Sequence, residues 1–175
     1  MFAEYDPAGA RRDLPGPAVV RPATADDLTA CARLLVDRSG GLISAWVARL
    51  ATDLDDPHKA LFVVEVGDVV GYGRASWFTA PHEAPRDVAP SGYYLTGVLV
   101  DALWRRRGLA ELLTRARLEW VWRRAPVCWY FANATNRPSL DLHAKLGFQV
   151  VTSDFWFPGV TFEGGKGLPC RVDRP

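Results

Sequence analysis

The chain has little cysteine and no long apolar segment. Its three cysteines, Cys31, Cys128 and Cys170, are odd in number and lie far apart without the spacing of metal ligands. Neither a disulfide framework nor a zinc site is therefore expected. The sequence contains no apolar run of about 18 residues, the length that a membrane helix needs, and no signal-peptide pattern follows Met1. These features predict a soluble protein of the reducing cytoplasm, with no metal and no membrane contact.

An excess of one charge is also lacking. The net charge is +1, which argues against a general nucleic-acid-binding protein. Internal repeats, low-complexity segments, a P-loop and a full G-x-G-x-x-G pattern are missing as well. What remains is a chain of 175 residues, 49% hydrophobic and 23% charged, which is enough for one globular domain with its own core.

Hydrophobic periodicity divides the chain into alternating elements. Residues 1–17 are rich in proline and glycine and predict an N-terminal extension, a candidate for disorder, ahead of a single domain over residues 18–173. Two or three short strands are expected after Phe148. The order predicts an α+β fold with a mixed sheet. The expected strands are 19–21, 61–66, 69–77, 93–100 and 127–132, and the expected helices are 25–36, 43–54, 109–122 and 138–146.

The most informative stretch runs from Tyr93 to Trp122. An apolar strand leads through the basic turn 105–107 and Gly108 into an amphipathic helix. The first turn of a helix leaves backbone N–H groups unpaired and carries partial positive charge, and glycine lets a phosphate approach that backbone. The turn therefore predicts a site for a diphosphate-bearing ligand. The more distant arginines (Arg115, Arg117, Arg123 and Arg124) fit a solvated helix face equally well.

The same residues carry a family resemblance. Arg105-x-x-Gly108-x-Ala110 resembles the Q/R-x-x-G-x-G/A motif of the GNAT (GCN5-related N-acetyltransferase) family. A second pattern follows at the right distance and resembles N-x-x-S-x-x-x-[YH]-x-x-x-G-F, in the His-bearing form of phosphinothricin-type acetyltransferases; it consists of Asn136, Ser139, His143 and Gly147-Phe148. The resemblance implies a GNAT acyl-CoA N-acyltransferase fold, with a central mixed sheet of six to seven strands flanked by about four helices.

The resemblance also implies an activity, the transfer of an acetyl group from acetyl-CoA to an amine by direct attack in a ternary complex. The edge of the strand at 98–100 would pair with the pantetheine amides, and Gly97 would either form a bulge there or serve packing. Asn136 is either a CoA contact or a turn residue. The implied CoA-binding residues are Val98, Leu99, Val100, Arg105, Arg106, Arg107, Gly108, Leu109, Ala110, Glu111, Asn136, Ser139 and His143.

His143 and Tyr94 are the implied catalytic residues. His143 stands where many members have a tyrosine that faces the CoA sulfur, so it would either protonate the departing thiolate or hydrogen-bond to CoA or substrate. Tyr94 stands where many members have a glutamate. The base therefore stays open between Tyr94, Glu83 or His82 in the preceding loop, an ordered water, and an amine that needs no base.

The motifs do not name the acceptor. The phosphinothricin-like second motif favours a small-molecule primary amine; a protein or peptide amine and a non-enzymatic acyl-CoA-binding module are the alternatives. Three of the seven tryptophans, Trp77, Trp129 and Trp156, would either line the acceptor site or belong to the core, and Trp46 more often belongs to a core than to a site. The oligomeric state stays open, and a homodimer is a candidate because dimers are common in the family.

Overall fold

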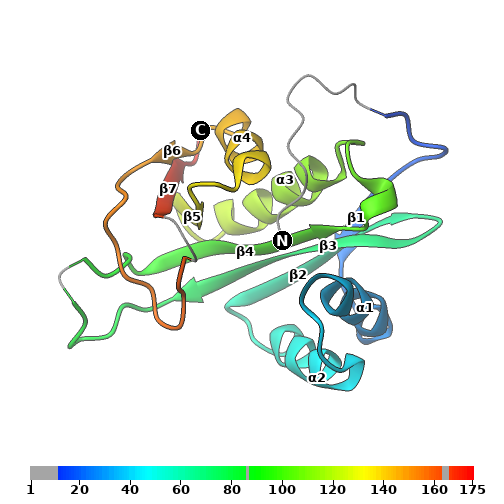
Figure 1. Ribbon diagram of the computed structural model, residues 1–175, viewed down its shortest axis with the longest axis horizontal. Coiled ribbons are helices and arrows are strands. Elements are labelled where there is room, and N and C mark those ends of the chain that lie inside the picture. Colours follow the sequence, from blue (N-terminus) through cyan, green and yellow to red (C-terminus); the bar gives the residue numbers. More distant parts are fainter. Residues whose placement is uncertain (1–11, 86, 163–165) are drawn as a thin grey trace.

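One mixed sheet of seven strands forms the centre of the molecule, and the computed structural model describes residues 12–85, 87–162 and 166–175 (Figure 1). The strands are β1 (Val19–Pro22), β2 (Lys59–Val66), β3 (Asp68–Phe78), β4 (Gly92–Val100), β5 (Val127–Asn133), β6 (Gln149–Val150) and β7 (Gly167–Asp173). The helices are α1 (Leu28–Ser39), α2 (Ile43–Leu54), α3 (Leu109–Trp122) and α4 (Arg137–Lys145), with short 3-10 turns η1 (Ala25–Asp27) and η2 (Ala102–Trp104).

The strand order is β1-β2-β3-β4-β5-β7-β6. Only β4 and β5 pair in parallel, and every other neighbouring pair is antiparallel. Figure 1 shows α1 and α2 on one face of the sheet and α3 and α4 on the other. Seven strands and four α-helices in a mixed sheet confirm the predicted fold class.

Two predicted elements differ in detail from the structure. The first predicted helix is divided into η1 and α1, and the Asp27 carboxylate accepts hydrogen bonds from the Thr24 backbone N–H (2.7 Å) and hydroxyl (3.0 Å). The expected strands 61–66 and 69–77 leave a two-residue turn, Gly67-Asp68. This prediction is wrong by one residue, because Asp68 pairs with Val66 and only Gly67 lies between the strands. Gly67 has a φ of +78°, which glycine adopts at little cost.

Small residues on β3 let α3 lie close to the sheet. Gly71, Gly73 and Ala75 alternate along the strand and so share one face. A Cβ added at Gly73 would lie 2.9 Å from Nε of Arg117 on α3. Ala75 packs in the same core cluster as Leu118 of α3. The small residues on this face of β3 are therefore explained by the short distance between the strand and α3.

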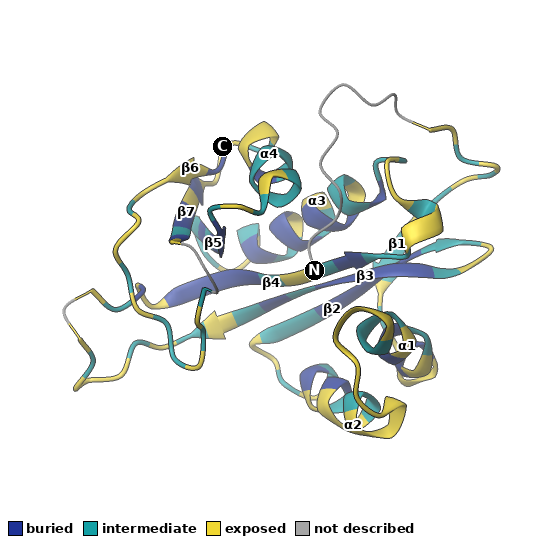
Figure 2. Cartoon of the chain, in the orientation of Figure 1, coloured by how far each residue is buried: buried dark blue, intermediate teal, exposed yellow. Residues whose placement is uncertain are grey.

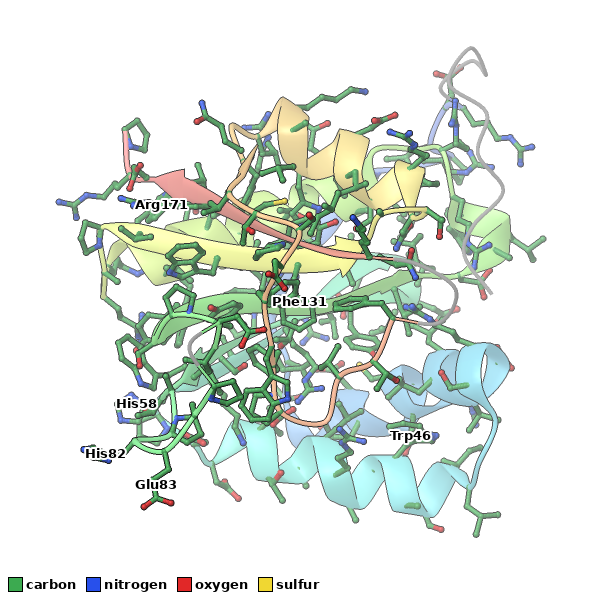
Figure 3. The ribbon with its side chains drawn as sticks, turned by 60° about the vertical axis from the view of Figure 1, so that its left-hand side comes forward. Trp46, His58, His82, Glu83, Phe131 and Arg171 are labelled. Carbon is green, nitrogen blue, oxygen red and sulfur yellow. The ribbon has the colours of Figure 1, made fainter. Side chains whose placement is uncertain are left out.

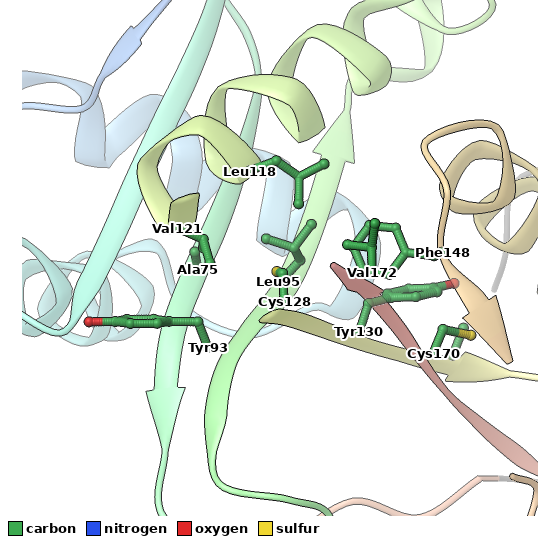
Figure 4. Packing of buried hydrophobic residues seen from close by; sticks show 11 residues of the cluster. Ala75, Tyr93, Leu95, Leu118, Val121, Cys128, Tyr130, Phe148, Cys170 and Val172 are labelled. Carbon is green, nitrogen blue, oxygen red and sulfur yellow. The ribbon is translucent and has the colours of Figure 1, made fainter. Parts of the chain in front are cut away.

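The core lies on both faces of the sheet. Figure 2 shows the helices with their buried sides toward the sheet and their exposed sides outward. The largest cluster joins α3 to β4, β5 and β7, and Tyr130 and Phe148 lie within it (Figure 4). Leu28, Cys31 and Leu50 form the cluster under α1 and α2. Burial raises the pKa of the Cys31 thiol to about 12, so this side chain packs as a neutral apolar group.

An ion-pair network ties β1 to the first helix and to β2. Arg21 donates to both carboxylate oxygens of Asp27, at 2.7 and 2.8 Å, and also pairs with Glu65. The bond to Arg21 lowers the pKa of the mostly buried Asp27 carboxyl to about 2. Arg21 therefore joins β1 to η1 through Asp27 and to β2 through Glu65.

The N-terminal segment touches the turn that precedes α3. The backbone N–H of Arg12 donates to the carbonyl of Arg106 (2.8 Å), and Leu14 packs against the cluster that contains Leu109. Of the predicted extension, residues 1–11 lie outside the described part, and the domain boundary at residue 18 stays a prediction.

The chain after α4 contains two of the expected two or three strands. Residues 151–162 between β6 and β7 form no helix or strand, and they meet the loop before β4 through a parallel bridge between Val88 and Trp156. In the part of the chain that the structure describes, no helix is long and apolar enough to cross a membrane.

Candidate active site

The strands β4 and β5 form a wedge. They pair only at their N-terminal ends, through Tyr93 with Cys128 and Tyr94 with Trp129, although β4 continues to Val100. Over the described residues, the edge of β4 from residue 95 to 100 has no strand beside it on that side. An unpaired edge offers main-chain donors and acceptors to an extended ligand.

Gly97 forms a bulge in the middle of this edge. Gly73 pairs with Val98 and Arg74 pairs with Thr96, so Gly97 is the extra residue on β4. Its φ is +68°, and a Cβ built there would meet nothing within 4 Å. The bulge alternative for Gly97 is therefore confirmed, since the backbone conformation requires glycine and packing does not.

The basic turn lies at the open end of the wedge. Arg106 has a φ of +65° and Gly108 a φ of +81°, two left-handed residues that turn the chain from β4 into α3. The Nε of Arg105 donates to the carbonyl of Val100 (3.2 Å), and the guanidinium of Arg107 lies 5.5 Å from the ring centre of Trp104. Arg105 thus binds the end of β4, and Arg107 packs on the 3-10 turn η2, so both contacts stabilise the basic turn.

The N-terminus of α3 has no side-chain cap. Gly108 is its N-cap residue, and the first helical hydrogen bond runs from the N–H of Leu112 to the carbonyl of Gly108 (3.1 Å). The N–H groups of residues 109–111 therefore have no partner within the helix. Glu111 faces Arg115 (2.7 Å), which offsets its charge. This end of α3 has the geometry of a phosphate-binding site.

The N-terminus of α4 lies at the same open end, because α3 and α4 follow parallel strands. Asn136 is the N-cap residue and its side chain makes no capping bond. The turn is closed instead by Asn133, whose Oδ1 accepts from the N–H (2.9 Å) and the hydroxyl (2.7 Å) of Thr135. The side chain that stabilises this turn is therefore that of Asn133 and not that of Asn136. This favours a ligand contact over the role of a turn residue for Asn136.

His143 is buried beside β5. It is 2% exposed and stacks on Tyr130 with ring centres 3.6 Å apart. Its Nδ1 lies 2.8 Å from the carbonyl oxygen of Ser139, which can only accept, so Nδ1 carries the proton. The Ser139 hydroxyl accepts from the Tyr130 hydroxyl (2.9 Å). Ser139, His143 and Tyr130 therefore form one connected group.

The Nε2 atom of His143 is buried and has no hydrogen-bond partner. Burial lowers the pKa of His143 to about 3, and the bond to Ser139 opposes that change. The imidazole is therefore neutral near pH 7, and Nε2 is available as an acceptor. This state favours hydrogen bonding to a ligand over donation of a proton to a thiolate.

Tyr94 lies fully buried at the apex of the wedge. Its hydroxyl donates to the carbonyl of Pro90 (2.7 Å), and burial raises the pKa of the phenol above its usual value. A hydroxyl that is held in this way is a poor base near neutral pH. These contacts favour a structural role for Tyr94, and its catalytic role stays a prediction.

The other candidate bases lie on an exposed loop. His82 and Glu83 are exposed, and Figure 3 shows them with His58 at an outer edge, apart from Phe131 of β5. Trp46 is only half-buried, and its indole N–H donates to the carbonyl of Gly40 (2.9 Å), so it fastens the connection between α1 and α2. Nothing in these contacts brings His82 or Glu83 to the wedge.

An aromatic surface lies on the face of the sheet opposite α3, beside the wedge. Phe157 is at its centre, with ring-centre distances of 4.3 Å to Phe78, 4.8 Å to Phe131 and 5.4 Å to Tyr94. No helix of the described residues covers this part of the sheet, which lies under the segment 151–162. We call it the aromatic face; it consists of Phe78, Tyr94, Trp129, Phe131, Phe155, Phe157 and Phe162.

The three tryptophans named from the sequence have different environments. Trp129 stacks on Tyr94 within the aromatic face, at 6.3 Å. Trp77 is 42% and Trp156 37% exposed, so neither is a core residue. Trp77 meets the edge of Tyr93 at 5.0 Å, and Trp156 links two loops through backbone bonds to Asp87 and Ala89.

Neither a second cavity nor a metal-ligand cluster offers another candidate active site among the described residues. A cavity of about 650 Å³ lies between the C-terminal half of α3 and β7, lined among others by Trp122 and Arg171, but this is the closed end of the wedge. Among the described residues, no three His, Cys, Asp or Glu side chains gather as a metal site requires.

Sequence reasoning missed several residues that shape the wedge. Arg117 is 1% exposed and lies under the Gly97 bulge, so the solvated helix face is wrong for this arginine. Asn133 and Phe157 were also not singled out. A glycine at position 73, opposite a long polar residue, was the available signal for Arg117, and it has meaning only once β3 and α3 are known to touch.

Comparison with known proteins identifies the family. The sequence profile described as "Acetyltransferase (GNAT) family" matches residues 25–148, which is most of the chain. The protein therefore belongs to the GNAT acetyltransferase family, and it is an acyltransferase that uses acetyl-CoA as co-substrate. The open edge of β4 and the uncapped N-terminus of α3 fit the pantetheine and pyrophosphate of that ligand.

Several solved structures have a similar fold. A ribosomal-protein-alanine N-acetyltransferase from Brucella melitensis has a TM-score of 0.69 at 22% identity, over 89% of this chain and 99% of that one. An N-acetyltransferase from Staphylococcus aureus Mu50 scores 0.68 at 23% identity, over 90% and 99%. The putative acetyltransferase yncA from Salmonella typhimurium, solved with its cofactor acetyl-CoA, scores 0.69 at 18% identity, over 89% and 93%. No curated protein matches the chain significantly.

Proposed function

We propose that the protein acetylates the primary amine of a small molecule with an apolar or aromatic body. The observation that carries this proposal is the aromatic face. Its rings meet the wedge from the side opposite α3, where Tyr94 and Phe131 belong to β4 and β5 themselves. Ring faces bind apolar groups by burial and ammonium groups through their π electrons. A second support is the His form of the second motif, which resembles that of phosphinothricin-type enzymes.

Polar groups beside the aromatic face would orient the amine. The hydroxyls of Ser76 and Thr96 lie 3.5 Å apart on neighbouring strands. Further along, the buried carboxylate of Asp53 on α2 pairs with Arg74 (2.6 Å) and Lys59 (3.3 Å). Since two cations already offset this carboxylate, the hydroxyls are the better contacts for an incoming amine.

The acetyl-CoA half of the site would be formed mainly by backbone. The edge at Val98, Leu99 and Val100 would pair with the pantetheine amides. The turn at 105–108 and the first N–H groups of α3, at Leu109, Ala110 and Glu111, would hold the pyrophosphate. Asn136, Ser139 and His143 would contact the CoA arm, with Nε2 of His143 accepting a hydrogen bond. Together these are the CoA-binding residues predicted from the sequence.

The reaction itself needs few groups. The amine lone pair attacks the thioester carbon, a C–N bond forms, and the carbonyl π electrons move to oxygen. The C=O bond then forms again, the C–S bond breaks, and its electron pair leaves on sulfur as the CoA thiolate. The ammonium proton is lost and the thiolate takes up a proton, which gives an amide and CoA. Since His143 is neutral and Tyr94 is held by Pro90, we assign the proton transfers to water in the wedge.

Calorimetry and a thiol-release assay test this function. Titration with acetyl-CoA is expected to show binding, and release of CoA thiol is then measured with matched amines. Phenethylamine and tryptamine would represent aromatic bodies, ethanolamine and spermidine polar ones, and a peptide with a free N-terminal alanine would represent protein acceptors. We expect kcat/KM for the aromatic amines to exceed that for ethanolamine by at least about tenfold, as expected when a ring is bound by an apolar surface.

The peptide is the rival acceptor, because the Brucella melitensis neighbour is described as a ribosomal-protein-alanine N-acetyltransferase. Turnover that favours the peptide over phenethylamine would replace the small-molecule assignment. Phe131→Ala should reduce the preference for phenethylamine, whereas Trp46→Phe, on α2, should not. An unchanged preference in Phe131→Ala would reject the aromatic face as the acceptor surface.

A further inference from the structure

Arg117 is a cation buried in the middle of the molecule. It is 1% exposed, and its guanidinium donates to the carbonyls of Leu113 (3.2 Å), Arg74 (3.2 Å) and Gly97 (3.3 Å) and to the Thr114 hydroxyl (2.7 Å). Among the described residues, no carboxylate lies within ion-pair distance of it. Every partner of this charge is therefore neutral.

Such a charge is costly to bury. Burial lowers the pKa of Arg117 to about 10, so the guanidinium is still protonated near pH 7. Well-packed apolar residues in place of buried ionic groups are often neutral or stabilising, because the desolvation cost is removed. Stability alone therefore gives the fold no reason to hold a cation here.

The surrounding chain is built to accept this side chain. A Cβ at Gly73 would lie 2.9 Å from Nε and 3.2 Å from Cζ of Arg117, so only glycine leaves the required space. The Thr114 hydroxyl donates to the carbonyl of Ala110 (2.7 Å) while it accepts from Arg117. Residues of α3, β3 and β4 thus form one compartment around the guanidinium.

The compartment lies against the bulge of the wedge. Arg74 and Gly97 stand on the two strands where their register shifts, and Arg117 binds the carbonyl of each with the same Nη1 atom. Gly97 belongs to the edge of β4 that is open to a ligand. The guanidinium is thus hydrogen-bonded to a peptide group of the strand that borders the wedge.

We propose that Arg117 is a positioning residue for acetyl transfer: it holds the β4 bulge in shape and places a positive charge beside the thioester in the wedge. Attack by the amine puts negative charge first on the thioester oxygen and then on the CoA sulfur. A fixed cation that is itself buried stabilises such charge more than it stabilises the neutral thioester. The inference rests on acetyl transfer in this wedge, but not on which amine is used.

The first test replaces the charge with an apolar side chain of similar reach. In Arg117→Leu we expect kcat to fall by about 10- to 100-fold, as for removal of one group that stabilises developing charge. KM for acetyl-CoA should change by less than about threefold. The melting temperature should change little, since the removed desolvation cost offsets the hydrogen bonds that Arg117 no longer donates. Arg115→Leu, the same change on the exposed side of α3, is the control, with kcat unchanged.

Two further variants keep the test decisive if Arg117→Leu fails to fold. Arg117→Lys keeps a charge but offers one nitrogen in place of the three that bind the carbonyls and the Thr114 hydroxyl, so kcat should lie between those of the wild type and Arg117→Leu. Gly73→Ala keeps residue 117 as arginine, but the added Cβ displaces its guanidinium. We therefore expect kcat to fall in this variant as well. Full turnover in Arg117→Leu, or full turnover in both single variants Gly73→Ala and Arg117→Lys, would overturn the proposal.

A second readout needs no acceptor and therefore separates this inference from the proposed function. A thiol near a buried cation loses its proton at lower pH. The affinity for free CoA, divided by the affinity for acetyl-CoA, should be higher at pH 9 than at pH 7 in the wild type. In Arg117→Leu this ratio should no longer increase with pH. Two titrating groups interact electrostatically with Arg117, Cys128 with a pKa of about 12 and His143 with one of about 3, and both keep their charge over this range. An equal gain in wild type and variant would reject the role of Arg117, whatever the amine panel shows.

Discussion

The two edges of β4 are used in opposite ways. On one side β4 pairs with β3 from Gly92 to Val100, interrupted only by the Gly97 bulge. On the other side it meets β5 at two residues and then diverges. The same strand therefore closes the sheet with one edge and opens it with the other. Paired backbone groups stabilise the fold, whereas the unpaired ones are available to a ligand.

This contrast indicates where substitutions should cost stability and where they should cost activity. Residues that support the paired edge, such as Gly71, should affect folding. Residues at the open edge and at the helix ends beyond it, such as Gly108, should affect acetyl-CoA binding. His143 and Tyr94 lie between the two, since both are buried and both border the wedge. Four changes test the separation, from the largest expected effect to the smallest.

The largest effect is expected at the open end. Gly108→Glu should weaken acetyl-CoA binding by about 100-fold or more, equivalent to about 2.7 kcal/mol, because a carboxylate would stand at the N-terminus of α3, the proposed site of the pyrophosphate. Calorimetric titration measures the change. Gly67→Glu is the matched control, since Gly67 has a similar φ of +78° but lies in the hairpin between β2 and β3. Equal affinities in the two variants would disprove the phosphate site.

The paired edge should respond in stability. A Cβ at Gly71 would lie 2.7 Å from the carbonyl oxygen of Leu99, a backbone atom that cannot move alone. Gly71→Ala should lower the free energy of unfolding by about 2–3 kcal/mol, measured by urea denaturation. Gly73→Ala, two residues along the same strand, should instead reduce turnover. If both variants lost only stability, β3 would play no part in positioning Arg117.

His143 should make stability depend on pH. Its pKa is about 3 in the folded protein against roughly 6.5 when unfolded, so between these values the unfolded chain binds more protons. The free energy of unfolding should therefore fall as pH drops, by about 2 kcal/mol between pH 7 and pH 5 from this residue alone. His143→Gln should remove that part of the slope. The free energy of unfolding of the wild type and of His143→Gln is measured by denaturation at pH 7 and at pH 5. If both proteins lost the same amount between these pH values, His143 would not be buried as a neutral group.

The smallest effect is expected for Tyr94. Tyr94→Phe removes the hydrogen bond to Pro90 and should cost about 1 kcal/mol of stability. The pH–rate profile should keep its shape, because the phenol is held as a donor and burial raises its pKa. If the rise in rate with increasing pH were lost in Tyr94→Phe, the general base would instead be assigned to Tyr94.

The motif at the open edge was predictable from the sequence because it depends on local backbone. Gly97 and Gly108 have positive φ values that few other residues tolerate, so the chain must carry glycine there. The strands, the helices and the order β-α-α-β-β-β-α-β-α-β-β follow from periodicity in the same local way. The hairpin turn was misjudged by one residue because the bulge at Val64 and Glu65 shifts the register, and a bulge has little signal in one strand.

The sequence by itself therefore determined the elements and the family and predicted an anion-binding turn, since each of these depends on residues that are near one another in the chain. The tertiary structure decided which buried polar groups serve the wedge. Arg117 has the same sequence neighbourhood as the exposed Arg115, and only the packing of α3 on Gly73 removes it from water. The aromatic face likewise joins β3, β4, β5 and the segment 151–162. Contacts between distant segments set burial, and burial decides whether a charged or aromatic side chain is a surface group or part of a site.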